Sequence, residues 1–465
     1  MEQKDAQYIK MTETPVGGLI TTLAIPTIIS MMVSAIYSMA DTYFVSKLGT
    51  SASAAVGIVF SLMALIQALG FTVGMGAGTT ISRLLGAKQN KKANEVAASG
   101  FYFSICCGLL LAIAGMRNID ALMHLLGATS TILPFASQYS FYILFAAPVM
   151  AACFLLNNVL RAEGKAKQAM FGIVSGGIIN CFLDPLFIFT FKMGIGGAAI
   201  ATAISQCISF VILIYPFIKG RTVTKIKMAF VSSNPRLYLL ILKNGLPTFC
   251  RQSLSSVATV TLNVTAAIYG DAAVAAVSIV GRIVMFMFSI TLGIGQGFQP
   301  VLGYNYGAKK FSRVREAMFF TVKISTLVMT VCALMGYFNA SSLMRIFIAN
   351  DAEVINIGAT TLRAQCFAVP LIPMMVMCNM TFQGLGRSWI ATILSTARQG
   401  FFFLPIILVF PRFFGLFGVQ IAQALADICT FFLCLPFIYK FLKELEAKKM
   451  ACSIDDSCPD KKSNS

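Results

Sequence analysis

The chain has 465 residues, of which 57% are hydrophobic and 12% are charged, and its formal net charge is +18. Soluble domains are about one quarter charged, so this composition excludes an ordinary soluble protein, and the high apolar content excludes an intrinsically disordered chain. The basic residues lie between long apolar runs instead of forming one basic domain, which argues against nucleic-acid binding.

Long apolar segments recur along the whole chain. A helix that crosses a bilayer needs about 20 mostly apolar residues. About twelve segments meet this length, and they begin near Gly17, Ala52, Val96, Leu133, Gln168, Gly194, Leu237, Ala273, Ala317, Val354, Trp389 and Gly415. We therefore predict an all-α membrane protein with about twelve transmembrane helices. The first apolar run is too long for a removable signal peptide.

The basic residues indicate how these helices are oriented. Every second connection, starting with the second, is basic, and together with the two chain ends these segments hold 26 of the 36 Lys and Arg residues. The other connections hold only Lys47, Arg117, Lys192, Arg345 and Arg412. Because basic loops stay in the cytoplasm, we predict a multi-pass protein of the cytoplasmic (inner) membrane with both termini in the cytoplasm.

The two halves of the chain resemble each other at a fixed offset. Pro26 and Pro247 are separated by 221 positions, as are Gly86 and Gly307. Two copies of six helices that enter from the same face are related by a pseudo-two-fold axis along the membrane normal, an arrangement typical of transporters. The predicted organisation is a cytoplasmic segment 1–16, an N-lobe 17–220, a cytoplasmic linker 221–236, a C-lobe 237–442 and a disordered cytoplasmic tail 443–465.

Three acidic residues, Asp41, Asp184 and Asp427, lie inside predicted spans. A charge at membrane depth costs about 2.5–3.5 kcal/mol, so such residues face a cavity or a partner and by default suggest function. The second half has no acid at the positions equivalent to Asp41 and Asp184, which favours a role specific to the first half. Each acid also has a structural alternative. Asp41 could reach the membrane–water interface near the end of its helix, and Asp184 could lie at a helix end set by Pro185. Asp427, which is equivalent to Gln206 in the repeat, could form a hydrogen bond between helices.

Polar side chains of the first half complete a candidate cavity around Asp41 and Asp184. Asn180 precedes Asp184 by four residues and so lies on the same helix face. The other polar residues lie on the fourth and sixth predicted helices, and they are Tyr139, Asn157, Thr202 and Gln206. Two carboxylates in a low-dielectric site repel each other, which favours binding of a proton. Alternatively, ionised carboxylates with amide and hydroxyl oxygens form a site for a hard cation such as Na+. The pattern leaves both open.

Arginines are embedded in the second half, at Arg251, Arg282, Arg363 and Arg398. Span ends or carbonyl partners are the expected explanation for Arg282 and Arg398. Arg251 follows Pro247 by about one helical turn, and with Gln252 it is a candidate for lining a substrate cavity. Gln206 and Ser255 complete this candidate set.

The sequence shows no pattern typical of an enzyme, a disulfide framework or a zinc site. The 13 cysteines show no C-x-x-C spacing and most lie in apolar runs, so we predict neither a disulfide framework nor a zinc site. The chain has no Walker A sequence and no nucleophile–base or metalloprotease signature. We therefore expect no enzyme activity, no metal beyond a possible Na+ at Asp41 and Asp184, and no cofactor beyond the coupling ion.

Several stretches together resemble one transporter family over nearly the whole chain up to about Lys440. They include "IPTIISMMVSAIYSMADTYFVSKLG", "NNVLRAEGKAKQAM", "NCFLDPLFIF" and "GIGGAAIATAISQ". The chain is similar to multidrug and toxic compound extrusion (MATE) transporters, in particular the DNA-damage-inducible branch and its staphylococcal-type multidrug exporters. This resemblance implies two six-helix lobes that form a V-shaped cleft, and export of organic, often cationic, drugs against inward proton or sodium flow.

The resemblance also implies a cation-coupling site in the first lobe. The family positions fall on Asp41, Tyr139, Asn157, Asn180, Asp184 and Thr202. Another branch of the family carries acids on the seventh and tenth helices. Here the seventh-helix position holds Ser255 and the tenth helix has no acid, which places coupling in the first lobe.

The embedded acids and the family resemblance together favour a cation-coupled multidrug antiporter that works by alternating access. We expect a monomer in the lipid bilayer that takes small-molecule drugs and organic cations and no nucleic acid. The nearest alternative is a lipid-linked saccharide flippase of the same superfamily, whose pyrophosphate the arginines would hold. A channel or a membrane-embedded enzyme is a more distant alternative.

Overall fold

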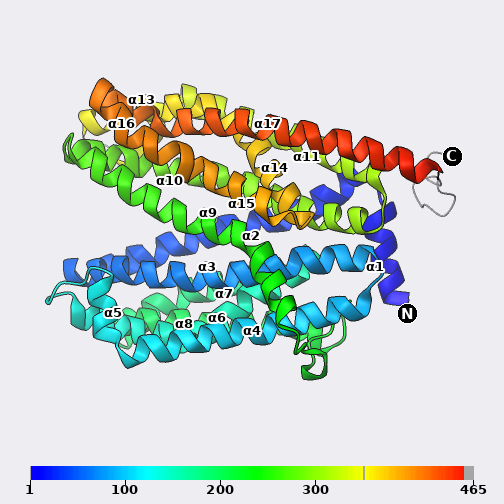
Figure 1. Ribbon diagram of the computed structural model, residues 1–465. Helices are drawn as coiled ribbons and strands as arrows, with labels where there is room; N and C mark the ends of the chain where they lie inside the picture. Colours follow the sequence, from blue (N-terminus) through cyan, green and yellow to red (C-terminus); the bar gives the residue numbers. More distant parts are fainter. Residues whose placement is uncertain (1, 349–350, 455–465) are drawn as a thin grey trace. The chain divides into compact units, whose positions relative to one another are not determined.

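The computed structural model describes residues 2–348 and 351–454, and regular structure within these ranges is entirely helical (Figure 1). A lipid environment offers no water to backbone N–H and C=O groups, so apolar segments of this length satisfy these groups within helices. Among the described residues, eleven helical segments are long and apolar enough to cross a membrane. The predicted segment near Leu237 forms a further long helix, α9 (Pro235–Ala267), which is less apolar because it carries Lys243 and Arg251.

The helices divide between two compact units. The first unit comprises residues up to Met11 and Ile25–Gly245. Its elements are α1 (Glu2–Glu13), α2 (Val16–Ser46), α3 (Thr50–Gly86), α4 (Asn90–Arg117), α5 (Ile119–Leu125), α6 (Leu133–Ala162), α7 (Ala166–Pro185), the π-helix η1 (Leu186–Thr190), α8 (Gly194–Ile218) and the 3-10 helix η2 (Met228–Phe230). Helix α6 is central in this unit, because it packs against α3, α4 and α8 (Figure 1).

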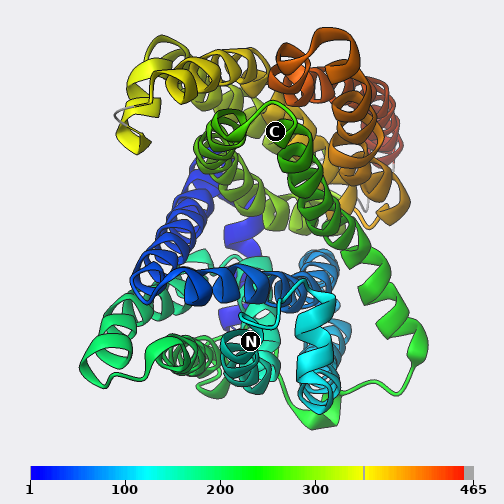
Figure 2. The ribbon, with the colours of Figure 1, turned by 90° about the vertical axis from the view of Figure 1, so that its left-hand side faces the viewer.

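The second unit comprises Thr12–Ala24 and the chain from Leu246 on. Its elements are α9, α10 (Asp271–Gly307), α11 (Phe311–Phe338), α12 (Ala340–Phe347), α13 (Ala352–Ala368), the 3-10 helix η3 (Val369–Leu371), α14 (Ile372–Gly384), α15 (Ser388–Thr396), the π-helix η4 (Ala397–Phe403), α16 (Leu404–Phe414) and α17 (Leu416–Ile454). Figure 2 views many of the helices of each unit nearly end-on.

The two units repeat the same order of helices, which confirms the predicted internal repeat. Helices α10 and α11 begin and end 221 positions after α3 and α4. The turns that follow α3 and α10 contain Lys88 and Lys309, whose φ angles are 58° and 59°. Such left-handed conformations are uncommon for a side chain of this size, so their recurrence at equivalent positions marks a shared backbone path.

Two helices pass from one unit to the other at equivalent points. Helix α2 belongs to the second unit up to Ala24, and α9 belongs to the first unit up to Gly245. The change of unit thus comes just before Pro26 in α2 and Pro247 in α9, where a backbone hydrogen bond is missing. The boundary between the two units therefore lies inside these two helices, whereas the lobe boundaries predicted from the sequence lie between helices.

Glycines allow these exchanged half-helices to pack closely. In the first unit, a Cβ atom at Gly76 would overlap the backbone carbonyl of Ile241 in α9. In the second unit, a Cβ atom at Gly297 would lie 2.6 Å from the backbone nitrogen of Ala24 in α2. Gly76 and Gly297 are 221 positions apart, so both repeats use the same close helix contact.

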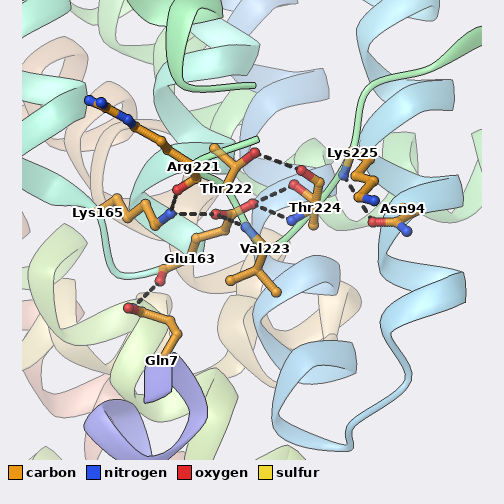
Figure 3. Close-up of polar contacts among 9 residues, drawn as sticks. All are labelled: Gln7, Asn94, Glu163, Lys165, Arg221, Thr222, Val223, Thr224 and Lys225. Carbon is orange, nitrogen blue, oxygen red and sulfur yellow. Dashed lines mark hydrogen bonds and ion pairs between the residues drawn. The ribbon is translucent and has the colours of Figure 1, made fainter. Parts of the chain in front are cut away.

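The linker predicted at 221–236 is held on the first unit by a buried carboxylate (Figure 3). Glu163, in the turn between α6 and α7, is fully buried. Its carboxylate accepts hydrogen bonds from the backbone N–H groups of Val223 and Thr224, both at 2.8 Å. It also accepts from the Thr224 hydroxyl and forms an ion pair with Lys165 at 3.8 Å. We call these four residues the linker clamp.

Further bonds surround the linker clamp. The backbone N–H of Lys225 donates to Asn94 Oδ1 on α4 at 2.9 Å, and Gln7 of α1 donates to the Glu163 carbonyl at 2.6 Å (Figure 3). Burial raises the pKa of the Glu163 carboxyl, while the Thr224 hydrogen bonds and the Lys165 charge act in the opposite direction. The linker is therefore an ordered part of the first unit.

The end of α17 differs from the sequence-based expectation. The helix continues to Ile454, so residues 443–454 are helical where a disordered tail is predicted, and residues 455–465 lie outside the described residues. Glu444 explains the difference, because it pairs with Arg387 and with Lys448, one turn further along α17, at 2.9 Å. Such i,i+4 ion pairs stabilise a helix.

Candidate functional site

Four predicted site residues lie at one end of the first unit, on four different helices. Asp41 precedes the end of α2 by five residues, and Tyr139 and Thr202 follow the starts of α6 and α8 by six and eight residues. Asp184 precedes the end of η1 by six residues. At 1.5 Å per residue, each lies roughly 8–12 Å from its helix end. All four side chains are buried.

Asn180 links two of these helices. Its side-chain amide donates to Asp184 Oδ1 at 3.0 Å and to the Thr202 hydroxyl at 3.3 Å. Asn180 and Asp184 lie one turn apart on α7, and Thr202 lies on α8. We call Asp41, Tyr139, Asn180, Asp184 and Thr202 the acidic cluster.

The charges of the acidic cluster lie close enough to interact. Asp41 interacts electrostatically with Asp184 and with Tyr139. Tyr37, one turn before Asp41 on α2, interacts with both acids. A Cβ atom at Gly177 would lie 3.2 Å from the Tyr37 ring, so the small Gly177 brings α7 against α2 here. Tyr37 is not among the residues predicted from the sequence, although its spacing of four residues from Asp41 places both on one helix face.

Four buried oxygens of the acidic cluster have no hydrogen-bond partner within the described part of the chain. They are Oδ1 of Asp41, the hydroxyl oxygen of Tyr139, Oδ1 of Asn180 and Oδ2 of Asp184. The same ranges contain no Lys or Arg that forms an ion pair with Asp41 or Asp184. Buried polar groups are normally paired, and an exception points to a function or to a missing ion. These oxygens suit a proton or a hard cation.

Asn157 is not part of this group of side chains. It lies 18 residues after Tyr139 on α6, which corresponds to roughly 27 Å along the helix. Its amide donates to the Ala169 carbonyl near the start of α7 at 3.0 Å. The equivalent Asn379 donates to the Ala391 carbonyl at 2.7 Å. The same bond in both repeats indicates that Asn157 connects two helices at the opposite end of the unit.

The predicted substrate-cavity residues are divided between the units. Gln206 lies on α8, one turn from Thr202, and its carbonyl accepts a bond from the Cys153 thiol at 3.5 Å. Arg251 and Gln252 are half-buried on α9 within the second unit, and Ser255 on the same helix is exposed.

The second unit contains a buried ion pair. Asp427 on α17 is fully buried and pairs with Arg398 of η4, with Nε–Oδ1 and Nη2–Oδ2 distances of 2.7 and 3.2 Å. Gln423, one turn before Asp427, donates to Asp427 Oδ1 at 2.9 Å. Asp427 therefore joins two helices, as the structural alternative for this residue predicts.

One protein-family model matches both halves of the chain. The MatE family model matches the chain twice, over residues 26–186 and 247–409. The two matches begin at Pro26 and Pro247, which are equivalent in the internal repeat.

Similar proteins cover nearly the whole chain. The multidrug export protein MepA of Staphylococcus saprophyticus is 27% identical over 96% of this chain and 98% of its own length. MepA of Staphylococcus aureus is 28% identical over 91% of this chain and 94% of its own length. A multidrug resistance MATE family transporter of the MOP superfamily, solved in an outward-facing conformation, is 27% identical with a TM-score of 0.89, over 95% of this chain and 98% of that one.

Proposed function

The chain belongs to the MatE family, and from this membership and the acidic cluster we propose that it is a cation-coupled multidrug exporter. It moves organic, often cationic, compounds out of the cell in exchange for protons or sodium ions. The names of the staphylococcal relatives support drug export. The distribution of Lys and Arg supports a multi-pass protein of the cytoplasmic membrane with both termini in the cytoplasm.

The absence of a protein cation beside Asp41 and Asp184, within the ranges that the structure covers, carries this proposal. Two buried carboxylates repel each other and are costly to leave ionised and unpaired. A proton or a sodium ion that enters from outside the cell removes this cost, and so does a cationic drug that enters from the cytoplasm. Drug and coupling ion therefore compete for the acidic cluster.

This competition provides the coupling. A ligand shifts a conformational equilibrium only by its difference in affinity for the two states. If the coupling ion binds the outward-open state more tightly, its binding favours release of the drug to the outside. Duplicated transporters reach such states by movement of one repeat relative to the other.

The test is efflux of ethidium from cells that carry Asp41→Asn or Asp184→Asn at unchanged protein level. We expect both variants to lose efflux, because an amide keeps the shape of the side chain but removes the charge. The matched control is Asp120→Asn, which removes an exposed acid that bonds only Ser137 among the described residues. Wild-type efflux by both cluster variants would refute the proposal.

Proteoliposomes with separately imposed proton and sodium gradients distinguish the two coupling ions. Thr202→Ala sharpens this comparison, because a hydroxyl oxygen is a ligand for sodium but is not needed to protonate a carboxylate. Sodium coupling predicts that Thr202→Ala raises the sodium concentration needed for half-maximal efflux. Proton coupling predicts efflux that depends on the pH gradient and persists without sodium.

A further inference from the structure

A group of charged side chains in the membrane-spanning part of the second unit carries a net positive charge, opposite in sign to the acidic cluster. Arg251 on α9, Arg398 on η4 and Asp427 on α17 form its buried or half-buried charges near the ion pair described above. Both carboxylate oxygens of Asp427 are engaged, by Arg398 and by Gln423. Asp427 therefore neutralises the charge of one guanidinium, that of Arg398.

Arg251 has no acidic partner among the described residues. It lies near enough to Arg398 for the two positive charges to repel each other. Within residues 2–348 and 351–454, no carboxylate forms an ion pair with Arg251. An arginine at membrane depth costs about 2.5–3.5 kcal/mol on insertion scales unless it is paired or reaches water. The local excess of one positive charge calls for an anion.

The packing of α9 against the π-helix η4 places this charge near further polar side chains. Leu254, one turn after Arg251, packs against Gly400 of η4, where an added Cβ atom would lie 3.1 Å from the Leu254 side chain. The same π-helix carries Arg398, whose guanidinium lies 4.8 Å from the centre of the Phe288 ring. It also carries Gln399, whose buried Oε1 has no hydrogen-bond partner among the described residues. π-helical segments occur frequently at functional sites.

The internal repeat shows that the six-helix unit does not require these charges. The equivalent positions in the first unit hold neutral residues, namely Ser30, Gly176 or Gly177 according to whether the offset is 222 or 221, and Gln206. Ser30 bonds only to the carbonyl one turn before it, at Pro26, among the bonds of the described chain. The charged set was therefore acquired or retained in one repeat only, as were the acids of the acidic cluster in the other.

We propose that Arg251, next to the Arg398 that Asp427 holds in place, binds a carboxylate group of an organic substrate. A guanidinium matches a carboxylate with two parallel hydrogen bonds, which a lysine ammonium does not reproduce. This inference rests on the proposed export function and assigns to one residue of the second unit the recognition of one chemical group of a substrate.

The test compares two rhodamine dyes, one with a free carboxylate and the other its methyl ester. Their binding to the purified full-length protein in detergent is measured by fluorescence anisotropy. We expect Arg251→Gln to weaken binding of the free acid about tenfold or more, because a hydrogen bond to a charged group is lost, and to change ester binding less than about twofold. Arg251→Lys should recover only part of the loss. Arg282→Gln, which removes an exposed arginine of the same unit, should change neither affinity.

Several outcomes of these binding measurements would overturn the proposal. Free-acid binding that is unchanged in Arg251→Gln, or lost equally for both dyes in a variant that elutes as a folded monodisperse species, overturns the proposal. If Arg251→Gln does not fold, a wild-type free-acid affinity in Arg251→Lys overturns it as well. Because binding is measured without transport, failure of the export proposal would show separately, as absent efflux of the ester dye.

Discussion

Removal of the Glu163 carboxylate should destabilise the first unit through the linker. Glu163→Ala leaves the backbone N–H groups of Val223 and Thr224 without acceptors, and both residues are buried. Each buried N–H without a partner costs about 1–3 kcal/mol, so the expected loss in the free energy of unfolding is about 2–6 kcal/mol. The weak ion pair to Lys165 at 3.8 Å adds little.

This loss converts into a measurable change in melting temperature. A folding unit of 150–250 residues loses about 2–4 °C per kcal/mol, so the lower ends of both ranges give a fall of about 4 °C. The assay is the monodisperse fraction of detergent-solubilised protein after heating, measured by size-exclusion chromatography. Glu95→Ala, which removes an exposed glutamate from α4, is the matched control. Equal melting temperatures for Glu163→Ala and Glu95→Ala would show that the linker clamp does not contribute to stability.

Three further predictions concern buried polar groups. Asn157→Ala should destabilise by about 1–2 kcal/mol, because it removes one interhelical hydrogen bond, and Asn379→Ala by more, because it also removes a bond to the Ser395 hydroxyl; a smaller thermal shift for Asn379→Ala than for Asn157→Ala would contradict this. Asp427→Asn should lower stability by about 3–5 kcal/mol, because it leaves the Arg398 charge unpaired, and adding Arg398→Met should restore most of the loss; a double variant as unstable as the single one would contradict this. Burial raises the pKa of Glu163 above its usual 4.5, so the folded state holds the proton more tightly than the unfolded chain. The stability of the wild type relative to Glu163→Gln should therefore fall as pH rises from 4.5 through the raised pKa. A difference in melting temperature between the two proteins that is the same at every pH would contradict this prediction.

Much of the architecture follows from local patterns in the sequence. Apolar length predicts the spans because the bilayer thickness sets the length of a helix, and the predicted starts near Leu133 and Gly194 coincide with the starts of α6 and α8. The repeat is visible because both copies keep glycines at close helix contacts, such as Gly76 and Gly297. Asp41 is recognisable because a carboxylate in an apolar segment is costly wherever the helix packs.

The tertiary structure alone decided which of these side chains meet. Asn157 and Tyr139 share a helix and a polar character, yet their separation along α6 places only Tyr139 with the acids. The partners of Glu163 and Asp427 come from segments 60 and 29 positions away, and neither pairing leaves a local pattern. Contacts between helices depend on how each helix is rotated and where it crosses its neighbour, which side-chain packing over the whole unit determines.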